Sequence, residues 1–245
     1  MKLFITLSCL IAVSYSRVPF SVSSSAAAKF ELSAAPKANQ FMDGYNYSNQ
    51  GGDSVRAIDY ISNLAEYNMD NRITSVCVTG IWLLYADSNY NTNNLKASNY
   101  WVFGDNYCTD VPVAFDNQAS SLRYTGAPDE WKADTLNMYL NPYFAGGEEY
   151  TYVDLPQVNY DDRAQSIIVT GCSPWTLYSN RNYGGSCMCV YPSDTSNCYP
   201  GFYTTQSSLG FLAGQISSAR RGCYCSSNKA FPDNYGDKSQ QNFEL

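Results

Sequence analysis

The chain contains no histidine, and only 15% of its 245 residues are charged. The absence of histidine excludes the Ser-His and Cys-His nucleophile systems of many hydrolases. Two adjacent pairs of acids, Glu148 with Glu149 and Asp161 with Asp162, could in principle perform acid–base catalysis. Neighbouring residues of a strand point to opposite faces, however, and exposed acids are usually just solvated. We therefore expect no catalytic activity.

Basic residues are also scarce. The formal net charge is −7, and no stretch of the chain is rich in Lys or Arg, so the electrostatic footprint of a nucleic-acid-binding protein is missing. Aromatic residues are abundant instead, with 22 tyrosines among them. A polar, aromatic chain of this kind favours β-structure over helices or disorder.

Long apolar runs are missing except at the start. Lys2 precedes an apolar run from Leu3 to Val13, and small residues follow at Ser14 and Ser16. This pattern predicts a secretory signal peptide over residues 1–16. The run is too short to cross a bilayer, and no other segment reaches its length. We expect a soluble, secreted, extracellular protein with no membrane span.

The cysteines fit that compartment. Nine become eight once Cys9 leaves with the signal peptide, and an even number in an oxidising environment predicts four disulfides. One bridge in the first part of the chain and three in the second would balance their distribution. The alternative is zinc, but the pairs with one intervening residue are tighter than a Cys-x-x-Cys knuckle. The eight are Cys77, Cys108, Cys172, Cys187, Cys189, Cys198, Cys223 and Cys225.

A repeat runs through the chain. Four tyrosines, here called the motif tyrosines, are each followed seven residues later by glycine or, once, by threonine. In three repeats an aromatic residue stands five positions after the tyrosine. Glycine is needed where φ is positive or where the backbone crowds a ring, so each tyrosine predicts a hairpin. The motif tyrosines are Tyr45, Tyr85, Tyr139 and Tyr178.

Each repeat also ends alike, in a polar string that leads into a short strand. These four closing strings are "DNRITS" (70–75), "DNQASS" (116–121), "DDRAQS" (161–166) and "AGQISS" (213–218). In the second and fourth repeats a tryptophan precedes the motif tyrosine by three residues. The chain therefore consists of a pair of repeats that is duplicated, each repeat supplying the four short strands of a Greek key. Two such sheets facing each other can bury a core.

These hairpins, tryptophans and closing strings resemble the βγ-crystallin family. The resemblance implies an all-β protein with two βγ-crystallin-like Greek-key β-sandwich domains, at 38–126 and 135–225, joined by a linker at 127–134. We expect residues 17–37 to be flexible and the polar tail at 226–245 to be disordered.

The resemblance also implies calcium sites in the first domain. Each site would take side chains from one closing string, a hydroxyl from its partner string and a carbonyl just after the motif tyrosine. Ca²⁺ accepts six to eight oxygens in irregular geometry, and the few carboxylates predict affinity near ~10⁻⁴–10⁻³ M. The side-chain candidates are Asp70, Asn71, Thr74, Asp116, Asn117 and Ser120, and the carbonyl candidates are Arg72, Gln118, Asn46 and Ala86.

The second domain departs from this pattern. Gln165 replaces the hydroxyl of the third string, while Ala213 and Gly214 replace the acid or amide residues of the fourth. At most one degraded site remains there. A purely structural role for the strings is the alternative, since Asp, Asn, Ser and Thr also form Asx-turns and caps, for example after a short helix within 54–68.

The expected function is therefore calcium binding in a structural or binding role. The alternative is a secreted recognition module, either lectin-like, a protease inhibitor or toxin-associated, because Tyr, Trp, Asn and Gly suit adaptable binding surfaces. Its partner would be an extracellular protein or glycan. The sequon Asn46-Tyr47-Ser48 predicts a glycan at Asn46.

Overall fold

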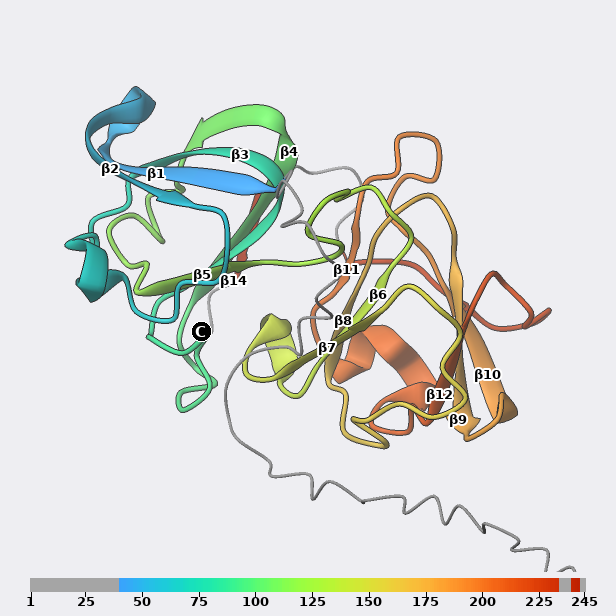
Figure 1. Ribbon diagram of the computed structural model, residues 1–245. Coiled ribbons are helices and arrows are strands. Elements are labelled where there is room, and N and C mark those ends of the chain that lie inside the picture. The colour runs from blue at the N-terminus through green and yellow to red at the C-terminus, as the bar shows by residue number, and fades with distance from the viewer. Residues whose placement is uncertain (1–39, 234–238, 243–245) are drawn as a thin grey trace, which may run out of the picture. The chain divides into compact units, whose positions relative to one another are not determined.

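The structure is a computed structural model that describes residues 40–233 and 239–242. The predicted signal peptide and the segment 17–37 lie outside the described residues. Figure 1 shows strands throughout, and the helices of the described residues are short 3-10 turns, so the predicted all-β fold is confirmed. The 3-10 turns are η1 (Ser48–Gln50), η2 (Leu64–Tyr67), η3 (Pro142–Phe144) and η4 (Gln206–Leu212).

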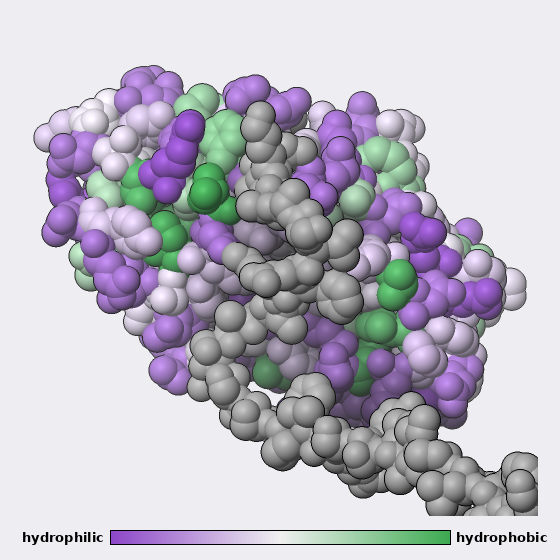
Figure 2. All heavy atoms as spheres, in the orientation of Figure 1, coloured by the Kyte–Doolittle hydropathy of each residue, from purple (hydrophilic) through white to green (hydrophobic). Residues whose placement is uncertain are grey.

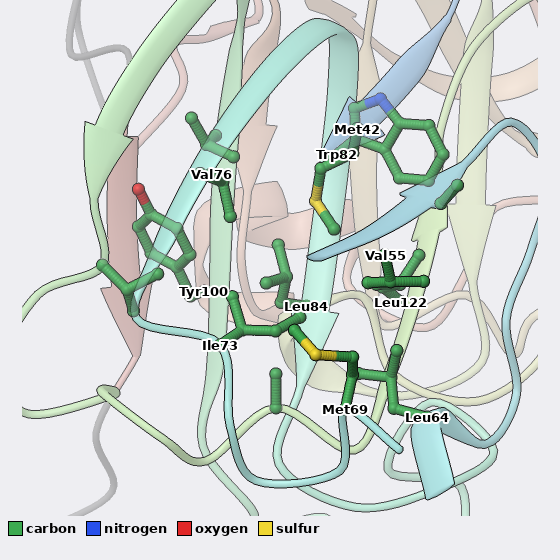
Figure 3. Close-up of a cluster of buried hydrophobic side chains, with 14 of the residues drawn as sticks. Met42, Val55, Leu64, Met69, Ile73, Val76, Trp82, Leu84, Tyr100 and Leu122 are labelled. Carbon is green, nitrogen blue, oxygen red and sulfur yellow. The ribbon is translucent and has the colours of Figure 1, made fainter. Parts of the chain in front are cut away.

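The first half of the described chain holds five strands around one core. They are β1 (Phe41–Tyr47), β2 (Gly51–Ala57), β3 (Ser75–Tyr85), β4 (Asn99–Asp110) and β5 (Ser121–Tyr124). Met42, Val76, Trp82 and Leu122 pack in its apolar core, which Figure 3 shows.

The long strands β3 and β4 each pass through both layers of this sandwich. The start of β3 pairs with β1 and with the end of β4, whereas its later part pairs with β5 and with the start of β4. The register shifts between Val78 and Gly80, and Gly80 has a φ of 106°. A side chain at Gly80 would also collide with that of Gln40, so only glycine fits this change of layer.

The second half forms two separate four-stranded sheets over a second core. One sheet has the order β11-β8-β6-β7 and the other the order β12-β9-β10-β13. Trp175, Leu177, Ile167 and Tyr203 are buried between them. The strands are β6 (Leu136–Tyr139), β7 (Glu148–Thr151), β8 (Ser166–Val169), β9 (Trp175–Asn180), β10 (Gly184–Val190), β11 (Gly201–Tyr203), β12 (Ser218–Arg221) and β13 (Lys229–Ala230).

In both halves a segment of one repeat joins the sheet of its partner repeat. In the second half, β11 of the fourth repeat pairs with β8 of the third, while Leu155 of the third bridges to Ala219 in β12 of the fourth. In the first half, Ile61 makes the corresponding bridge to Leu122. This exchange of strands makes each pair of repeats a single unit with a shared core.

The tail prediction was wrong at two places. Lys229–Ala230 pairs in parallel with β10, and β14 (Ser239–Asn242) pairs antiparallel with the start of β4. The tail carries no apolar periodicity, and a strand that adds to an exposed edge gains backbone hydrogen bonds without such a pattern. Residues 234–238 and 243–245 of the tail lie outside the described residues.

The four predicted disulfides form, one in the first half and three in the second. Cys77–Cys108 links facing residues of β3 and β4. In the second half Cys187–Cys225 and Cys189–Cys223 tie β10 to the segment after β12, and Cys172–Cys198 joins two loops. All eight cysteines that were candidates for zinc are therefore used in disulfides.

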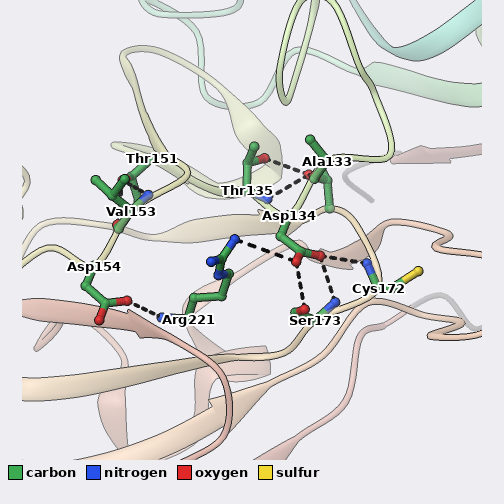
Figure 4. A network of polar contacts seen from close by, with 10 residues as sticks. Ala133, Asp134, Thr135, Thr151, Val153, Asp154, Cys172, Ser173 and Arg221 are labelled. Carbon is green, nitrogen blue, oxygen red and sulfur yellow. Dashed lines mark hydrogen bonds and ion pairs between the residues drawn. The ribbon is translucent and has the colours of Figure 1, made fainter.

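The end of the predicted linker is anchored to the second half by Asp134. Its carboxylate accepts hydrogen bonds from the backbone N–H groups of Cys172 (2.8 Å) and Ser173 (2.9 Å) and from the Ser173 hydroxyl (2.7 Å). Arg221 lies 3.9 Å from the same carboxylate. Figure 4 shows these contacts around Asp134. This network fixes the start of β6 against the loop that precedes β9.

The two halves meet in an apolar cluster, and the buried side chain of Arg123 reaches from the first half to the second beside it. Trp101 and Phe103 of β4 pack against Phe144 and Phe202 of the second half. Arg123, only 2% exposed, donates to the carbonyl oxygens of Phe144 (2.6 Å) and Gly146 (2.9 Å) and to the hydroxyl of Tyr85 (3.0 Å). These contacts tie the last strand of the first half to the third hairpin.

A half-buried carboxylate completes this junction. Glu148 accepts hydrogen bonds from the hydroxyls of Tyr139 and Tyr60, each at 2.6 Å. Burial raises the pKa of Tyr139, and the nearby charge of Glu148 raises it further. Glu149 instead accepts from the backbone N–H groups of Asn159 and Tyr160, each at 2.9 Å. The two adjacent acids are thus each engaged in a separate structural network.

Candidate functional site

The four hairpins have one backbone geometry, and this geometry sets the position of the site. In every repeat the residues four and five positions after the motif tyrosine have positive φ. In three repeats the aromatic residue at the second of these positions packs edge-on against the motif tyrosine. These residue pairs are Asn49 and Gln50, Asn89 and Tyr90, Tyr143 and Phe144, and Asn182 and Tyr183.

The last serine of each closing string locks its hairpin. Ser121 accepts a hydrogen bond from the N–H of Tyr90 (3.0 Å) and donates to the carbonyl of Asp87 (2.7 Å). The other three serines make the same two bonds in their own hairpins, with distances of 2.6 to 3.0 Å. All four are buried, so this position is structural and the residue before it is the one that faces the site. The four are Ser75, Ser121, Ser166 and Ser218.

The first two closing strings lie against each other crosswise. The N–H of Asn71 donates to the carbonyl of Ala119 (2.9 Å), and the N–H of Asn117 donates to the carbonyl of Ile73 (3.2 Å). Thr74 and Ser120 donate their N–H groups to the carbonyls of the two motif tyrosines, each at 2.8 Å. Each string therefore presents side chains to both hairpins of the first half.

Two oxygen-rich cavities result from this arrangement. Cavity 1 combines Thr74 of the first string with Asn117 of the second, whose Oδ1 lies 3.4 Å from the threonine hydroxyl. The Oδ1 atoms of Asn46 and of Asp116, the neighbour of Asn117, are buried and have no hydrogen-bond partner among the described residues. The lining residues of cavity 1 are Asn46, Tyr47, Ser48, Arg72, Thr74 and Asn117.

Cavity 1 also contains a cation of the chain itself. Arg72 lines it, donating to the carboxylate of Asp53 (2.8 Å) and to the carbonyl of Asn68 (2.7 Å). A guanidinium beside the cavity disfavours a divalent cation there, although the unpartnered oxygen of Asn46 favours one. The electrostatics of cavity 1 are thus mixed.

Cavity 2 is the more acidic of the two. It takes Asp70 from the first string and Ser120 from the second, and Asp87 from the second hairpin adds another carboxylate. Each carboxylate accepts one amide hydrogen bond, from Asn71 (3.1 Å) and from Asn94 (2.9 Å). Two carboxylates, amide oxygens and hydroxyls form a donor set suited to Ca²⁺. The lining residues are Asn63, Asp70, Asp87, Ser88, Asn93 and Ser120.

The structure brings together six of the ten predicted ligand residues and leaves four outside the cavity linings. Asn71 has a φ of 52°, and its amide supports Asp70 rather than facing a cavity. Gln118 donates to the carbonyl of Ala114 (2.7 Å). The four outside are Asn71, Asp116, Gln118 and Ala86.

The residue at the second position of every closing string has a left-handed backbone conformation, and this conformation explains why the residue is Asn, Asp or Gly. Asn71, Asn117, Asp162 and Gly214 have φ values of 52°, 56°, 56° and 63°. Asn, Asp and Gly tolerate this region best. The short helix suggested within 54–68 is the 3-10 turn η2, and it ends at Asn68, also left-handed, before Asp70 is reached.

Asp87, Asn63, Ser88 and Asn93 were missed by the sequence reasoning. Asp87 is an acid two residues after a motif tyrosine, and that is the signal that could have revealed it. Asn63 reaches cavity 2 because Ile61 bridges to Leu122 in β5, and this long-range pairing has no local pattern. Among the described residues no group of three or more Asp, Glu, Cys or His forms a metal cluster, so either cavity would rely on amides, hydroxyls and carbonyls.

Comparison with known proteins shows the fold. The model of the peptidase inhibitor family I36 matches residues 120–190. None of the curated proteins compared with the chain matches it. Geodin, a βγ-crystallin from Geodia cydonium, superposes with a TM-score of 0.57 at 20% identity, covering 75% of this chain and 99% of that chain.

Shorter βγ-crystallins align to part of the chain. One from an archaeon is 28% identical, and one from Ciona intestinalis is 18% identical. Each alignment covers 36% of this chain and 98% of the other, with a TM-score of 0.31. The likeness to Geodin shows that the chain has the fold of the βγ-crystallins.

Proposed function

We propose that this protein, whose fold is that of the βγ-crystallins, is a secreted calcium-binding protein with a structural or binding role and no catalytic activity. The observation that carries the proposal is cavity 2. There two carboxylates, Asp70 and Asp87, face one space together with the hydroxyl of Ser120. Like charges at close range repel each other, and a divalent cation between them would relieve the repulsion.

Calcium is the cation whose preferences these residues match. The donors are oxygens from carboxylates, amides and hydroxyls on three separate loops, which suits the irregular six- to eight-fold coordination of Ca²⁺ better than the strict octahedron of Mg²⁺. The affinity would be modest, near ~10⁻⁴–10⁻³ M, because few of the donors are charged. Arg72 makes cavity 1 the weaker of the two sites.

An extracellular location is supported by the disulfides. Four bridges in one chain are typical of proteins that fold in an oxidising compartment. Among the described residues, no helix is long and apolar enough to cross a membrane. Extracellular calcium is high enough to fill sites of modest affinity.

Isothermal calcium titration of the oxidised, full-length protein tests the proposal. The wild type should release or absorb heat, and Asp70→Asn should remove the stronger site by taking one carboxylate from cavity 2. Asp105→Asn is the matched control, because it makes the same charge change at an exposed residue of β4 outside both cavities. A wild type that shows neither heat nor a thermal shift with calcium would refute the proposal.

A second candidate function is peptidase inhibition, and a specific observation favours it. The inhibitor-family match at 120–190 includes Tyr152 and Val153, which are 60% and 55% exposed directly after β7. On the face drawn in Figure 2 hydrophilic side chains predominate and apolar ones form small groups, so two adjacent exposed apolar residues are notable.

The backbone at these two residues is held in place. The Thr151 hydroxyl donates to the carbonyl of Val153 (2.8 Å) and accepts from its N–H (3.1 Å). A pre-ordered loop loses little entropy on binding, as an inhibitor requires. Inhibition assays against peptidases of several classes test this candidate, with Tyr152→Ala and Val153→Ala expected to weaken inhibition. No inhibition of any class would refute it.

A further inference from the structure

We propose that, in the second half of the molecule, the guanidinium of Arg181 takes the place of a bound calcium ion, so that the counterpart of cavity 2 is a latent calcium site closed by a cation of the chain itself. This inference rests on the calcium site proposed at cavity 2. It concerns residues of the third and fourth repeats, where no metal site has been assigned.

The backbone establishes which residues correspond. Arg181 follows Tyr178 by three residues, as Ser88 follows Tyr85. The next residue in each hairpin donates its N–H across the loop, from Asn182 to the carbonyl of Pro156 (2.7 Å) and from Asn89 to the carbonyl of Ser62 (2.9 Å). Arg181 therefore occupies the position of Ser88, which lines cavity 2.

The oxygen donors of cavity 2 are largely kept in this counterpart. Asp161 opens the third string as Asp70 opens the first, and Ser217 stands in the fourth string as Ser120 stands in the second. The N–H of Ser217 donates to the carbonyl of Tyr178 (2.9 Å), which repeats the bond between Ser120 and Tyr85. The one lost carboxylate is that of Asp87, where the second half has Asn180.

Arg181 is bound to the first of these donors. Its Nη2 and Nε atoms lie 2.6 Å and 3.1 Å from Oδ2 of Asp161. The hydroxyl of Ser217 donates to Asp162, next in the string, at 3.3 Å. The other oxygen of Asp161, Oδ1, is buried and has no hydrogen-bond partner among the described residues. This oxygen, which takes no part in the ion pair, therefore remains available to coordinate a cation.

The charges agree with this substitution. Cavity 2 has two carboxylates in its lining and suits a divalent cation. In the counterpart Asn180 stands in place of Asp87, and the guanidinium of Arg181 pairs with the carboxylate of Asp161. Asp162, at the position of Asn71, adds a carboxylate that accepts from the hydroxyl of Ser217. The hydroxyl of Ser217 and the guanidinium of Arg181 lower the pKa of Asp161, so its carboxylate is charged at neutral pH. A cation tethered to the hairpin is always present at high effective concentration, and calcium must displace it to bind.

Exchanging the two residues tests the inference in the full-length, oxidised protein. Arg181→Ser should add one calcium equivalent in isothermal titration, together with calcium-dependent protection of residues 161–166 from hydrogen exchange. Adding Asp161→Asn to this variant should abolish the gain. Arg163→Ser is the matched control, because Arg163 contacts the carbonyl of Asn159 (3.3 Å) and the ring of Tyr160 but forms no ion pair among the described residues. It should add no site.

The reciprocal variant places an arginine in cavity 2. Ser88→Arg should pair with Asp70 and weaken calcium binding at that cavity by about tenfold or more, since a competing guanidinium must be displaced. This variant also decides the matter if Arg181→Ser does not fold. Unchanged affinity at cavity 2 in Ser88→Arg would then overturn the inference.

The outcomes separate the two proposals. If the wild type binds calcium in the first half and a folded Arg181→Ser gains nothing, the inference is overturned and the proposed function stands. If the wild type binds no calcium but Arg181→Ser does, the proposed function fails and the inference is supported. If neither protein binds calcium, both are overturned.

Discussion

The first half of the molecule has one disulfide and two cavities lined by oxygens, whereas the second half has three disulfides and an ion pair between Arg181 and Asp161. The hairpins and closing strings of both halves nevertheless share most of their backbone hydrogen bonds. The fold therefore fixes where the loops lie, and different chemistry can hold them there. We propose that calcium does so in the first half, and disulfides and an arginine in the second.

The largest expected difference in stability comes from removing one disulfide from each half in separate variants. Cys77→Ser/Cys108→Ser and Cys189→Ser/Cys223→Ser should each lower the free energy of unfolding by about 2–5 kcal/mol. Calcium at ten times its dissociation constant should return about 1.4 kcal/mol per site to the first variant. It should return nothing to a second half that unfolds on its own. Hydrogen exchange, resolved for each half and measured with and without calcium, gives the stability of both variants. If calcium stabilised the two halves equally, the proposed difference between them would be contradicted.

Arg123→Met should separate the two halves. The change leaves the carbonyl of Gly146 and the hydroxyl of Tyr85 without their buried donor, at a cost of about 3 kcal/mol. The carbonyl of Phe144 keeps only the hydrogen bond from the hydroxyl of Tyr85. We expect the halves of this variant to unfold in two resolved transitions by calorimetry. Arg220→Met is the control, because Arg220 stacks on Tyr224 at the surface, and it should cost less than about 1 kcal/mol. A single unchanged transition in Arg123→Met would show that the interface cluster alone joins the halves.

The serines that lock the hairpins should matter equally in both halves. Ser121→Ala and Ser218→Ala each remove two buried hydrogen bonds of matching length and should each cost about 2 kcal/mol. Denaturant unfolding of the two variants measures this, with Ser54→Ala as a control at an exposed residue of β2 outside both cavities. A large loss of stability in only one of the two variants would show that the same pair of hydrogen bonds contributes unequally to the two halves.

The smallest expected effect is on the stability of the second half at low pH. The folded-state pKa of Asp161 is lowered by Ser217 and Arg181, so its contribution to stability is complete above the unfolded-state pKa near ~3.9. That contribution is lost as the pH falls from there through the folded-state pKa. Arg181→Ser should therefore flatten the acid side of the stability curve of the second half below about pH 4. Identical acid limbs in the wild type and in the variant would contradict this role of Arg181.

Much of the fold could be predicted from the sequence because its repeat is local. The motif tyrosines, their glycines and the serine at the end of each string make contacts within or next to one hairpin, so their spacing alone identifies them. The left-handed residues Asn71 and Asn117 could be found by their residue type, although the backbone, rather than a ligand, explains them. The pairing of cysteines by halves followed from their unequal distribution.

The rest depends on contacts between distant segments. Asn63 lies at cavity 2 only because its segment crosses to β5, and β14 is ordered only because β4 offers an open edge. Arg181 appears unremarkable in the sequence, since its partner Asp161 is brought near by the strand exchange between repeats. Such pairings leave no periodic signal in a single chain.

Calcium titration of the wild-type protein, followed by hydrogen exchange in all four closing strings, tests the central claim most directly. The account predicts calcium-dependent protection of residues 70–75 and 116–121, with residues 161–166 and 213–218 unchanged. Protection that appears equally in all four strings, or in none of them, would contradict it.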